Sequence, residues 1–211
     1  IVRSLVGSEM CIRDSINPEE IGNSRNIVIS DQSGKSNIIS RLKSINIEID
    51  ENDPKIKKLL NEVKDREFIG YSYDGADASF ELLARRIIGE IPVYISITEY
   101  DVSVKKDSSG NIISSAKAQL KVDGEKILCE GEGTGPVNAL DNAIRQNVDK
   151  LAKYSKYLKD LKLVDYKVRI LNTGTEAVTR VSIESTDSNG KNWFTIGVST
   201  NIIDASFKAL V

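Results

Sequence analysis

The feature that most restricts the fold of this chain is an internal repeat with a spacing of 66 residues. Tyr100 in the first copy corresponds to Tyr166 in the second, and the turn glycine Gly124 corresponds to Gly190. Alternating strands alone would not place their turns at the same spacing, so we interpret the repeat as the duplication of one structural unit. The other matching pairs are Val102 with Val168, Val104 with Ile170, Gly131 with Gly197, Ala139 with Ala205, and Ala143 with Ala209.

Each copy has the pattern of three strands followed by one helix. Asp-Gly at 123–124 and Asn-Gly at 189–190 are typical of hairpin turns, and helices are expected from Pro136 and from the N-cap residue Asn201. The sequence therefore predicts an α+β fold with a duplicated βββα domain, in which two three-stranded antiparallel sheets each carry a helix. Because such thin layers leave a face uncovered, we expect symmetric pairing with an identical chain. The expected strands are 93–104, 113–122 and 127–129 in the first copy, and 163–171, 178–184 and 193–198 in the second.

Helical patterns dominate the residues before the repeat. Asp53 and Pro54 form a helix start, Asp74 is expected to open a second helix, and Gly89 is expected to end it. We therefore predict a connector subdomain over 16–90 and an allosteric dimerisation domain over 91–211. The first copy of the repeat spans about 91–155, and the second spans about 161–211. Residues 1–15 resemble a translated sequencing adapter and are expected to be non-native, and the last helix lacks a C-cap, so we expect the domain to be truncated there.

Composition excludes several classes of function. The chain has no histidine, which removes Ser-His-Asp catalysis, His-ligated metals and the most common general base. A net charge of −2 does not favour nucleic acid, and we expect no nucleic-acid partner. No apolar run reaches the roughly 18 residues of a membrane span, so we expect no membrane contact. With only two cysteines, a reducing, cytoplasmic location fits best.

The glycine-rich stretch at 131–136 is the strongest candidate site. It leads from a strand into a helix start, where backbone N–H groups and the positive end of the helix dipole suit a carboxylate. The spacing matches neither a dinucleotide-binding fingerprint nor a phosphate-binding loop. A plain tight connection is the alternative, and the residues alone leave both interpretations open. The carboxylates of Glu67, Asp74, Asp77 and Glu81 are residue types that bind metals, but exposed helical carboxylates are common, and we predict no metal site here.

Five segments resemble the allosteric domain and connector of the citramalate synthase and 2-isopropylmalate synthase family. The resemblance implies dimerisation and feedback binding of a branched-chain amino acid, isoleucine in the citramalate branch. It also implies that condensation of acetyl-CoA with pyruvate, and the divalent metal for it, belong to a catalytic barrel outside this chain. We therefore expect no catalytic residues and no cofactor here, and no activity of the chain alone. The five segments are 30–38, 70–83, 131–141, 163–171 and 197–206.

Carrying the family's effector site onto matching positions assigns eight residues to amino-acid binding. Three alternatives remain open: the same region of a 2-isopropylmalate synthase with leucine as effector, a dimerisation module without a ligand, and a self-sufficient enzyme that uses the connector carboxylates. The eight effector-binding candidates are Gly131, Gly133, Gly135, Pro136, Ala139, Leu151, Tyr154 and Val168.

Overall fold

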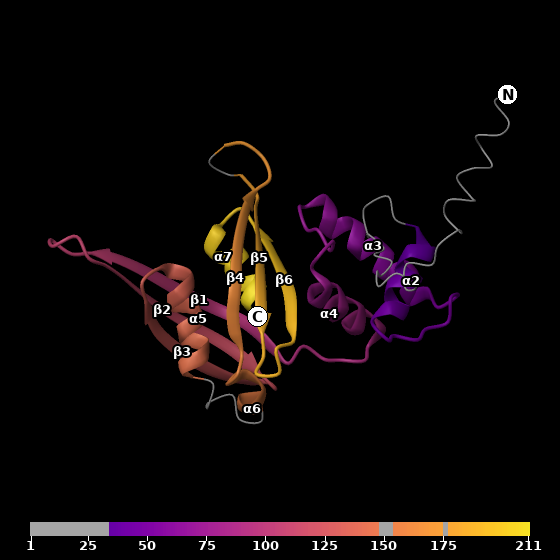
Figure 1. Ribbon diagram of the computed structural model, residues 1–211, viewed down its shortest axis with the longest axis horizontal. Helices are drawn as coiled ribbons and strands as arrows, with labels where there is room; N and C mark the ends of the chain where they lie inside the picture. The colour runs from indigo at the N-terminus through magenta and orange to yellow at the C-terminus, as the bar shows by residue number, and fades with distance from the viewer. Residues whose placement is uncertain (1–33, 148–153, 175–176) are drawn as a thin grey trace.

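The computed structural model describes residues 34–147, 154–174 and 177–211 (Figure 1). Within these ranges the chain forms a helical connector followed by two three-stranded sheets, each with its own helix. The predicted α+β class and the duplicated βββα arrangement are confirmed. The predictions for residues 1–15 and for the effector candidate Leu151 lie outside the described residues.

In the described part of the connector, from residue 34, three helices surround one apolar core. They are α2 (Lys35–Ser44), α3 (Pro54–Phe68) and α4 (Asp77–Ile88). Asp53 caps α3 as expected, because its side chain accepts a hydrogen bond of 2.8 Å from the N–H of Lys55. Gly89 ends α4 in the left-handed region at φ 87°, also as expected. The predicted start of α4 at Asp74 was wrong: the helix begins at Asp77, after the turn that Gly75 makes at φ 73°.

The first βββα unit is an antiparallel meander. Its strands lie in the order β1-β2-β3, and Asp123 and Gly124, at φ 50° and 96°, form the two-residue turn between the last two strands. The helix-bearing face of β2 presents small side chains to α5, which packs mainly on β2 and β3. The elements are β1 (Ile95–Lys106), β2 (Ile112–Val122), β3 (Glu125–Gly133) and α5 (Pro136–Gln146).

The second unit repeats the first down to its irregularities. The first strand of each unit has a bulge at the same place, at Thr98 in β1 and Val164 in β4, which are 66 residues apart. The spacing is not constant, however: Ser114 pairs with Gly133 while Thr179 pairs with Ser199, so the middle strands correspond at 65 residues. The elements, preceded by α6 (Ser155–Leu158), are β4 (Lys162–Ile170), β5 (Thr179–Thr186), β6 (Asn192–Ser199) and α7 (Ile202–Leu210).

Glycines let each helix lie directly on its sheet. A Cβ atom on Gly131 would lie 2.3 Å from the backbone nitrogen of Ala143 in α5. A Cβ on Gly197 would lie 2.0 Å from the carbonyl oxygen of Ala205 in α7. Since real Cβ contacts are never so short, the matching glycines of the repeat are explained by close helix-strand packing.

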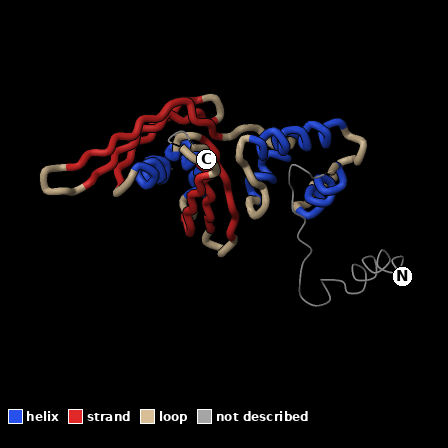
Figure 2. Tube along the Cα trace, turned by 90° about the horizontal axis from the view of Figure 1, so that it is seen from above, coloured by secondary structure: helices blue, strands red, loops and turns tan. Residues whose placement is uncertain are grey.

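The connector docks on the second sheet, at the edge strand β6 (Figures 1 and 2). The hydroxyl of Ser79 in α4 accepts a 2.9 Å hydrogen bond from the N–H of Ile196, and Arg180 donates through Nε to the carbonyl of Gly70 at 2.6 Å. The repeat explains why only one sheet is docked. The side chains on the face of β6 opposite α7 are apolar, whereas two of the three side chains at the matching positions of β3 are acidic. These are Phe194, Ile196 and Val198 in β6, and Leu128, Glu130 and Glu132 in β3.

The helices do not cover the first strand of either unit completely. Val104 in β1 and Ile170 in β4 occupy matching positions on the helix-bearing faces, and they remain 54% and 67% exposed. The β1–β2 hairpin extends well past α5 (Figure 1). Each unit therefore has an apolar strip that nothing in the described chain covers. Across the described ranges, no helix is long and apolar enough to cross a membrane.

Candidate functional site

The two strand-to-helix connections have the same fold but differ in what caps the helix. In the second unit, Asn201 is the N-cap of α7. Its side-chain oxygen accepts hydrogen bonds from the N–H groups of Ile203 at 2.8 Å and Asp204 at 3.3 Å. The donors at the start of α7 are therefore satisfied by the chain itself.

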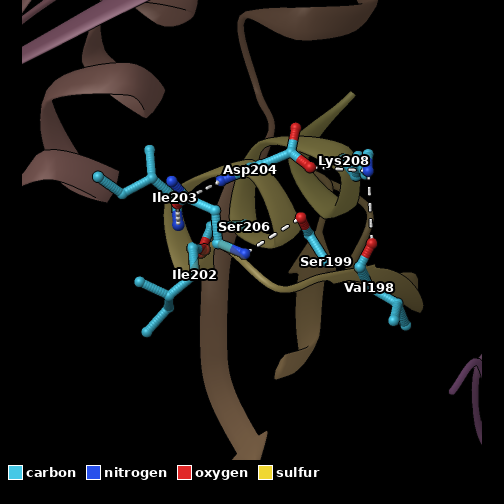
Figure 3. Close-up of polar contacts among 8 residues, drawn as sticks. Val198, Ser199, Ile202, Ile203, Asp204, Ser206 and Lys208 are labelled. Carbon is cyan, nitrogen blue, oxygen red and sulfur yellow. Dashed lines mark hydrogen bonds and ion pairs between the residues drawn. The ribbon is translucent and has the colours of Figure 1, made fainter. Parts of the chain in front are cut away.

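The start of α7 also carries its own negative charge. Asp204 lies in the first turn and forms an ion pair of 2.7 Å with Lys208, which also donates to the carbonyl of Val198 (Figure 3). Burial opposes ionisation of Asp204, but the hydrogen bonds from Lys208 and Ser199 outweigh it and hold its pKa below the usual range. A negative charge at this end of the helix is favourable because it complements the helix dipole.

The start of α5 in the first unit has neither of these features. Gly135 is the N-cap, and within the described chain no side chain caps the helix. Asn138 stands where the second unit has Asp204, so the first turn contains no acidic residue. The Asn138 side chain turns back instead and accepts a 3.2 Å hydrogen bond from the N–H of Thr134. The first N–H groups of α5 are therefore available to an acceptor from outside the chain.

Glycine at position 135 is not required by the local backbone. Its conformation, φ −154° and ψ 166°, is extended, and a Cβ added there would meet no atom of the described residues within 4 Å. This distinguishes Gly135 from Gly131 and from Gly133, whose Cβ would lie 2.4 Å from the Asn138 side chain. The absence of a side chain at Gly135 leaves open the space in front of the helix start.

A buried hydroxyl group lies on the same side of the sheet. Ser114 in β2 pairs with Gly133, and residues paired across strands share one face, which is here the face that carries α5. Among the residues that the structure describes, Ser114 is fully buried and its Oγ has no hydrogen-bond partner. Because buried polar groups are nearly always hydrogen-bonded, this hydroxyl indicates a missing polar partner near the start of α5.

A pocket of about 100 Å³ lies between the two units, beside the second half of α5. The difference in size between two matching residues of the repeat explains why this pocket is present. Phe207 of α7 fills the space over the first sheet, with its ring 5.2 Å from that of Tyr100, whereas the matching residue of α5 is the smaller Asp141. Asp141 is held at 2.7 Å by Arg145, which also donates to the carbonyl of Leu161. Both charges in the pocket are thus already paired, and its walls are mainly apolar: Ile144, Leu158, Leu161, Trp193 and Leu210.

The seven predicted effector residues that the structure describes do not converge on one place within a chain. Gly135 and Pro136 lie at the start of α5, where Ala139 is fully buried beneath the helix. Tyr154 lies at the other end of the unit, where its hydroxyl donates to Asp123 at 2.7 Å. Val168 lies on β4 and is 40% exposed. Gly131 and Gly133 have a packing role, as shown above, and the effector role of all eight residues remains a prediction.

Sequence reasoning missed Ser114 and the contrast between the two helix starts. The signal was available in the repeat, since Gly135 aligns with Asn201 and Asn138 with Asp204. The Asp141–Arg145 pair was also missed, because its position facing the second sheet depends on packing between the units. No group of three or more metal-ligating side chains was found in the described ranges, which include the connector carboxylates.

The duplicated βββα fold, with a helical connector before it, matches one known family of domains. Residues 74–211 match the family described as the LeuA allosteric (dimerisation) domain, and the chain belongs to that family. The match begins in the connector and includes α4, which packs on β6.

Similar curated relatives include (R)-citramalate synthases and a probable 2-isopropylmalate synthase. It is 43% identical over 200 residues to the (R)-citramalate synthase of Aquifex aeolicus, covering 93% of this chain and 37% of the relative. It is 41% identical over 201 residues to the same enzyme of Geobacter sulfurreducens, with 94% and 37% covered. A probable 2-isopropylmalate synthase of Methanopyrus kandleri is 27% identical over 204 residues, with 94% and 38% covered. The expected resemblance is confirmed, and the chain spans a little over a third of the length of these relatives.

Proposed function

We propose that this chain is the regulatory part of a citramalate synthase and that it binds isoleucine as a feedback effector where two copies pair. The observation that carries the proposal is the uncapped start of α5, which lacks the side-chain acceptor and the acidic residue found at the start of α7. A free amino acid always brings a carboxylate, and helix N-termini bind such groups through their N–H donors and dipole.

The second unit provides a template for the carboxylate. The side-chain oxygen of Asn201 accepts from the second and third residues of α7, so a carboxylate oxygen would accept from Val137 and Asn138 in the corresponding place on α5.

Apolar surface suited to a branched side chain adjoins this helix start. Val104 of β1 pairs with Ser114 of β2, and its side chain is 54% exposed. Ile112 lies on the same face of β2, two residues before Ser114, and is 53% exposed. Burying both against a ligand and a partner chain would remove apolar area from water, at about 25 cal/mol per Å². The incomplete cover of this strip supports a site that a second copy completes.

The pocket between the units is the weaker location for a whole amino acid. Its charged groups are already paired with each other. Arg145 lies nine residues along α5 from Pro136, roughly 13 Å away at the helical rise per residue, so one small ligand cannot reach both places within a chain.

The acyl transfer itself belongs, in this proposal, to a part of the parent enzyme outside these 211 residues. The resemblance implies condensation of acetyl-CoA with pyruvate on a metal-dependent barrel. Higher identity to citramalate synthases than to the 2-isopropylmalate synthase favours isoleucine over leucine as effector.

Isothermal titration with isoleucine, leucine and valine tests the proposal, and isoleucinamide, which lacks the carboxylate, is the matched control. We expect isoleucine to bind more tightly than leucine, and the amide to bind at least tenfold more weakly than isoleucine. Preference for leucine would reassign the parent to 2-isopropylmalate synthase. No heat with any amino acid would refute the sensor function, and equal binding of the amide would refute the helix-start site.

A further inference from the structure

The pocket between the two units has no role in the proposed function. We infer that it is a separate binding site for a small uncharged molecule with a short branched alkyl group and one oxygen that accepts hydrogen bonds. The lining residues come from α5 and α6 on one side and from β5, β6 and α7 on the other, so a ligand there would contact both units. The inference does not depend on which amino acid is the feedback effector.

The second repeat shows how the chain can fill the matching space. Phe207 of α7 is fully buried over the first sheet, whereas Asp141 at the matching position of α5 leaves a pocket of about 100 Å³ beside the second sheet. Unfilled apolar space lowers stability because the surrounding side chains lose packing contacts. A phenylalanine at position 141 would avoid this loss, so the smaller residue favours a function for the space.

Two polar groups in the wall of the pocket are available to a ligand. Ser185 of β5 and Trp193 of β6 pair across the strands, and both are half-buried. Within the described residues, neither the Ser185 hydroxyl nor the Trp193 indole N–H forms a hydrogen bond. An indole N–H only donates, and a hydroxyl donates or accepts, so together these groups suit an oxygen acceptor on the ligand.

The charged groups of the pocket disfavour an ionic ligand. The carboxylate of Asp141 lies 2.7 Å from Nε of Arg145, whose Nη1 also donates to the carbonyl of Leu161. An anion would have to displace Asp141 from Arg145, and a cation would have to displace Arg145 from Asp141. An uncharged ligand leaves this pair in place, and it loses less hydration on entering a mainly apolar pocket.

The volume of the pocket limits the ligand to a few heavy atoms. A cavity of about 150 Å³ lined by apolar side chains binds benzene, so a pocket of about 100 Å³ suits roughly four or five heavy atoms. The side chains of Ile144, Leu158 and Leu210 offer apolar contacts to an alkyl group. Isobutanol combines this size with one hydroxyl and is the probe for the site.

NMR of the ¹⁵N-labelled chain tests the inference, because Trp193 is the only tryptophan and its indole N–H gives a signal of its own. We expect isobutanol to shift this signal to saturation. Isobutyrate, which has the same branched alkyl group but carries a charge, should bind at least tenfold more weakly. A shift that rises linearly with isobutanol concentration, or similar affinity for isobutyrate, would overturn the inference.

A variant that fills the pocket tests its location. Asp141→Phe copies the residue of the second repeat onto the first, and it should abolish the saturable shift. Saturation at the wild-type concentration in a folded Asp141→Phe would contradict the site.

A pair of serine variants decides the question if Asp141→Phe does not fold. Ser185→Ala removes one hydrogen-bonding group from the pocket, and it should lower isobutanol affinity at least threefold without changing the melting temperature. Ser182→Ala is the matched control, because Ser182 lies on the opposite face of the same strand, and it should leave the affinity unchanged. Equal isobutanol affinities in the two variants would refute a ligand held by Ser185.

Competition with isoleucine separates this pocket from the proposed effector site. Saturating isobutanol should leave isoleucine affinity within twofold, because the pocket lies beside the second half of α5 rather than at its start. Displacement of isoleucine by isobutanol would overturn the inference. If isoleucine does not bind at all, a saturable shift of Trp193 with isobutanol would still support the pocket and would refute only the proposed effector.

Discussion

Replacing Gly131 by alanine tests the packing of helix on sheet that positions the start of α5. The added Cβ would lie 2.3 Å from the backbone nitrogen and 2.6 Å from the Cα of Ala143, and both atoms belong to the helix backbone. To restore an ordinary contact of about 3.5 Å, the helix must retreat by roughly 1 Å over its whole length. No side-chain rotation can absorb this change.

Overpacking of this kind costs about 1–3 kcal/mol, and a clash with rigid backbone belongs at the upper end of that range. A chain of this size loses roughly 2–4 °C in melting temperature per kcal/mol, so Gly131→Ala should melt roughly 6–12 °C below the wild type. Differential scanning calorimetry measures the shift directly.

Gly135→Ala is the matched control, because the same substitution four residues later meets no atom within 4 Å. Alanine is a poorer N-cap residue than glycine, which lowers stability, but it also restricts the unfolded chain, which raises stability. The free energy of unfolding should therefore change by less than about 0.5 kcal/mol. Equal melting temperatures for the two variants would refute the claim that Gly131 is glycine for packing reasons.

Three further predictions address pairing, docking and pH. Ile112→Asp should weaken dimerisation in analytical ultracentrifugation, whereas the control Ile113→Asp should not. The two side chains are similarly exposed, at 53% and 55%, but only Ile112 lies on the helix-bearing face of β2. Equal effects of the two substitutions would place the dimer interface elsewhere. Arg180→Met should destabilise the chain by about 2 kcal/mol in urea unfolding, since it leaves a loop carbonyl without its charged donor. Its exposed cross-strand neighbour provides the control, and Arg169→Met should be neutral or slightly stabilising. Because the pKa of Asp204 is lowered in the folded state, its contribution to stability is fully present above the unfolded pKa of about 3.9 and is lost as the pH falls through the folded-state pKa. Asp204→Asn should therefore flatten the acid limb of a plot of unfolding free energy against pH, and an unchanged limb would contradict that contribution.

The internal repeat predicted most of the fold because particular residue types favour particular backbone conformations. Asp123 and Gly124 adopt positive φ values that few other residue pairs tolerate, so these two residues were enough to predict the hairpin turn. Pro136 and Asn201 start their helices as expected, since one lacks an N–H that would be unsatisfied and the other supplies an acceptor.

Other features depend on contacts between distant parts of the chain and left no local signal. The start of α4 was placed three residues early because Asp74 is a good N-cap residue in isolation, whereas packing of the turn around Tyr73 and Ala76 decides the boundary. Docking of the connector on β6 follows from Ser79 and Arg180 reaching partners more than 100 residues away. Distances between the effector candidates also depend on how the helices and sheets pack, so the sequence motif alone did not show that Tyr154 and Gly135 lie at opposite ends of the first unit.

A crystal structure of the chain with isoleucine is the most direct test of the central claim. The account predicts two paired copies, with one isoleucine per chain whose carboxylate accepts from the N–H groups of Val137 and Asn138 and whose side chain lies against Val104 or Ile112. Isoleucine bound in the pocket beside Asp141, or at the start of α7, would contradict it.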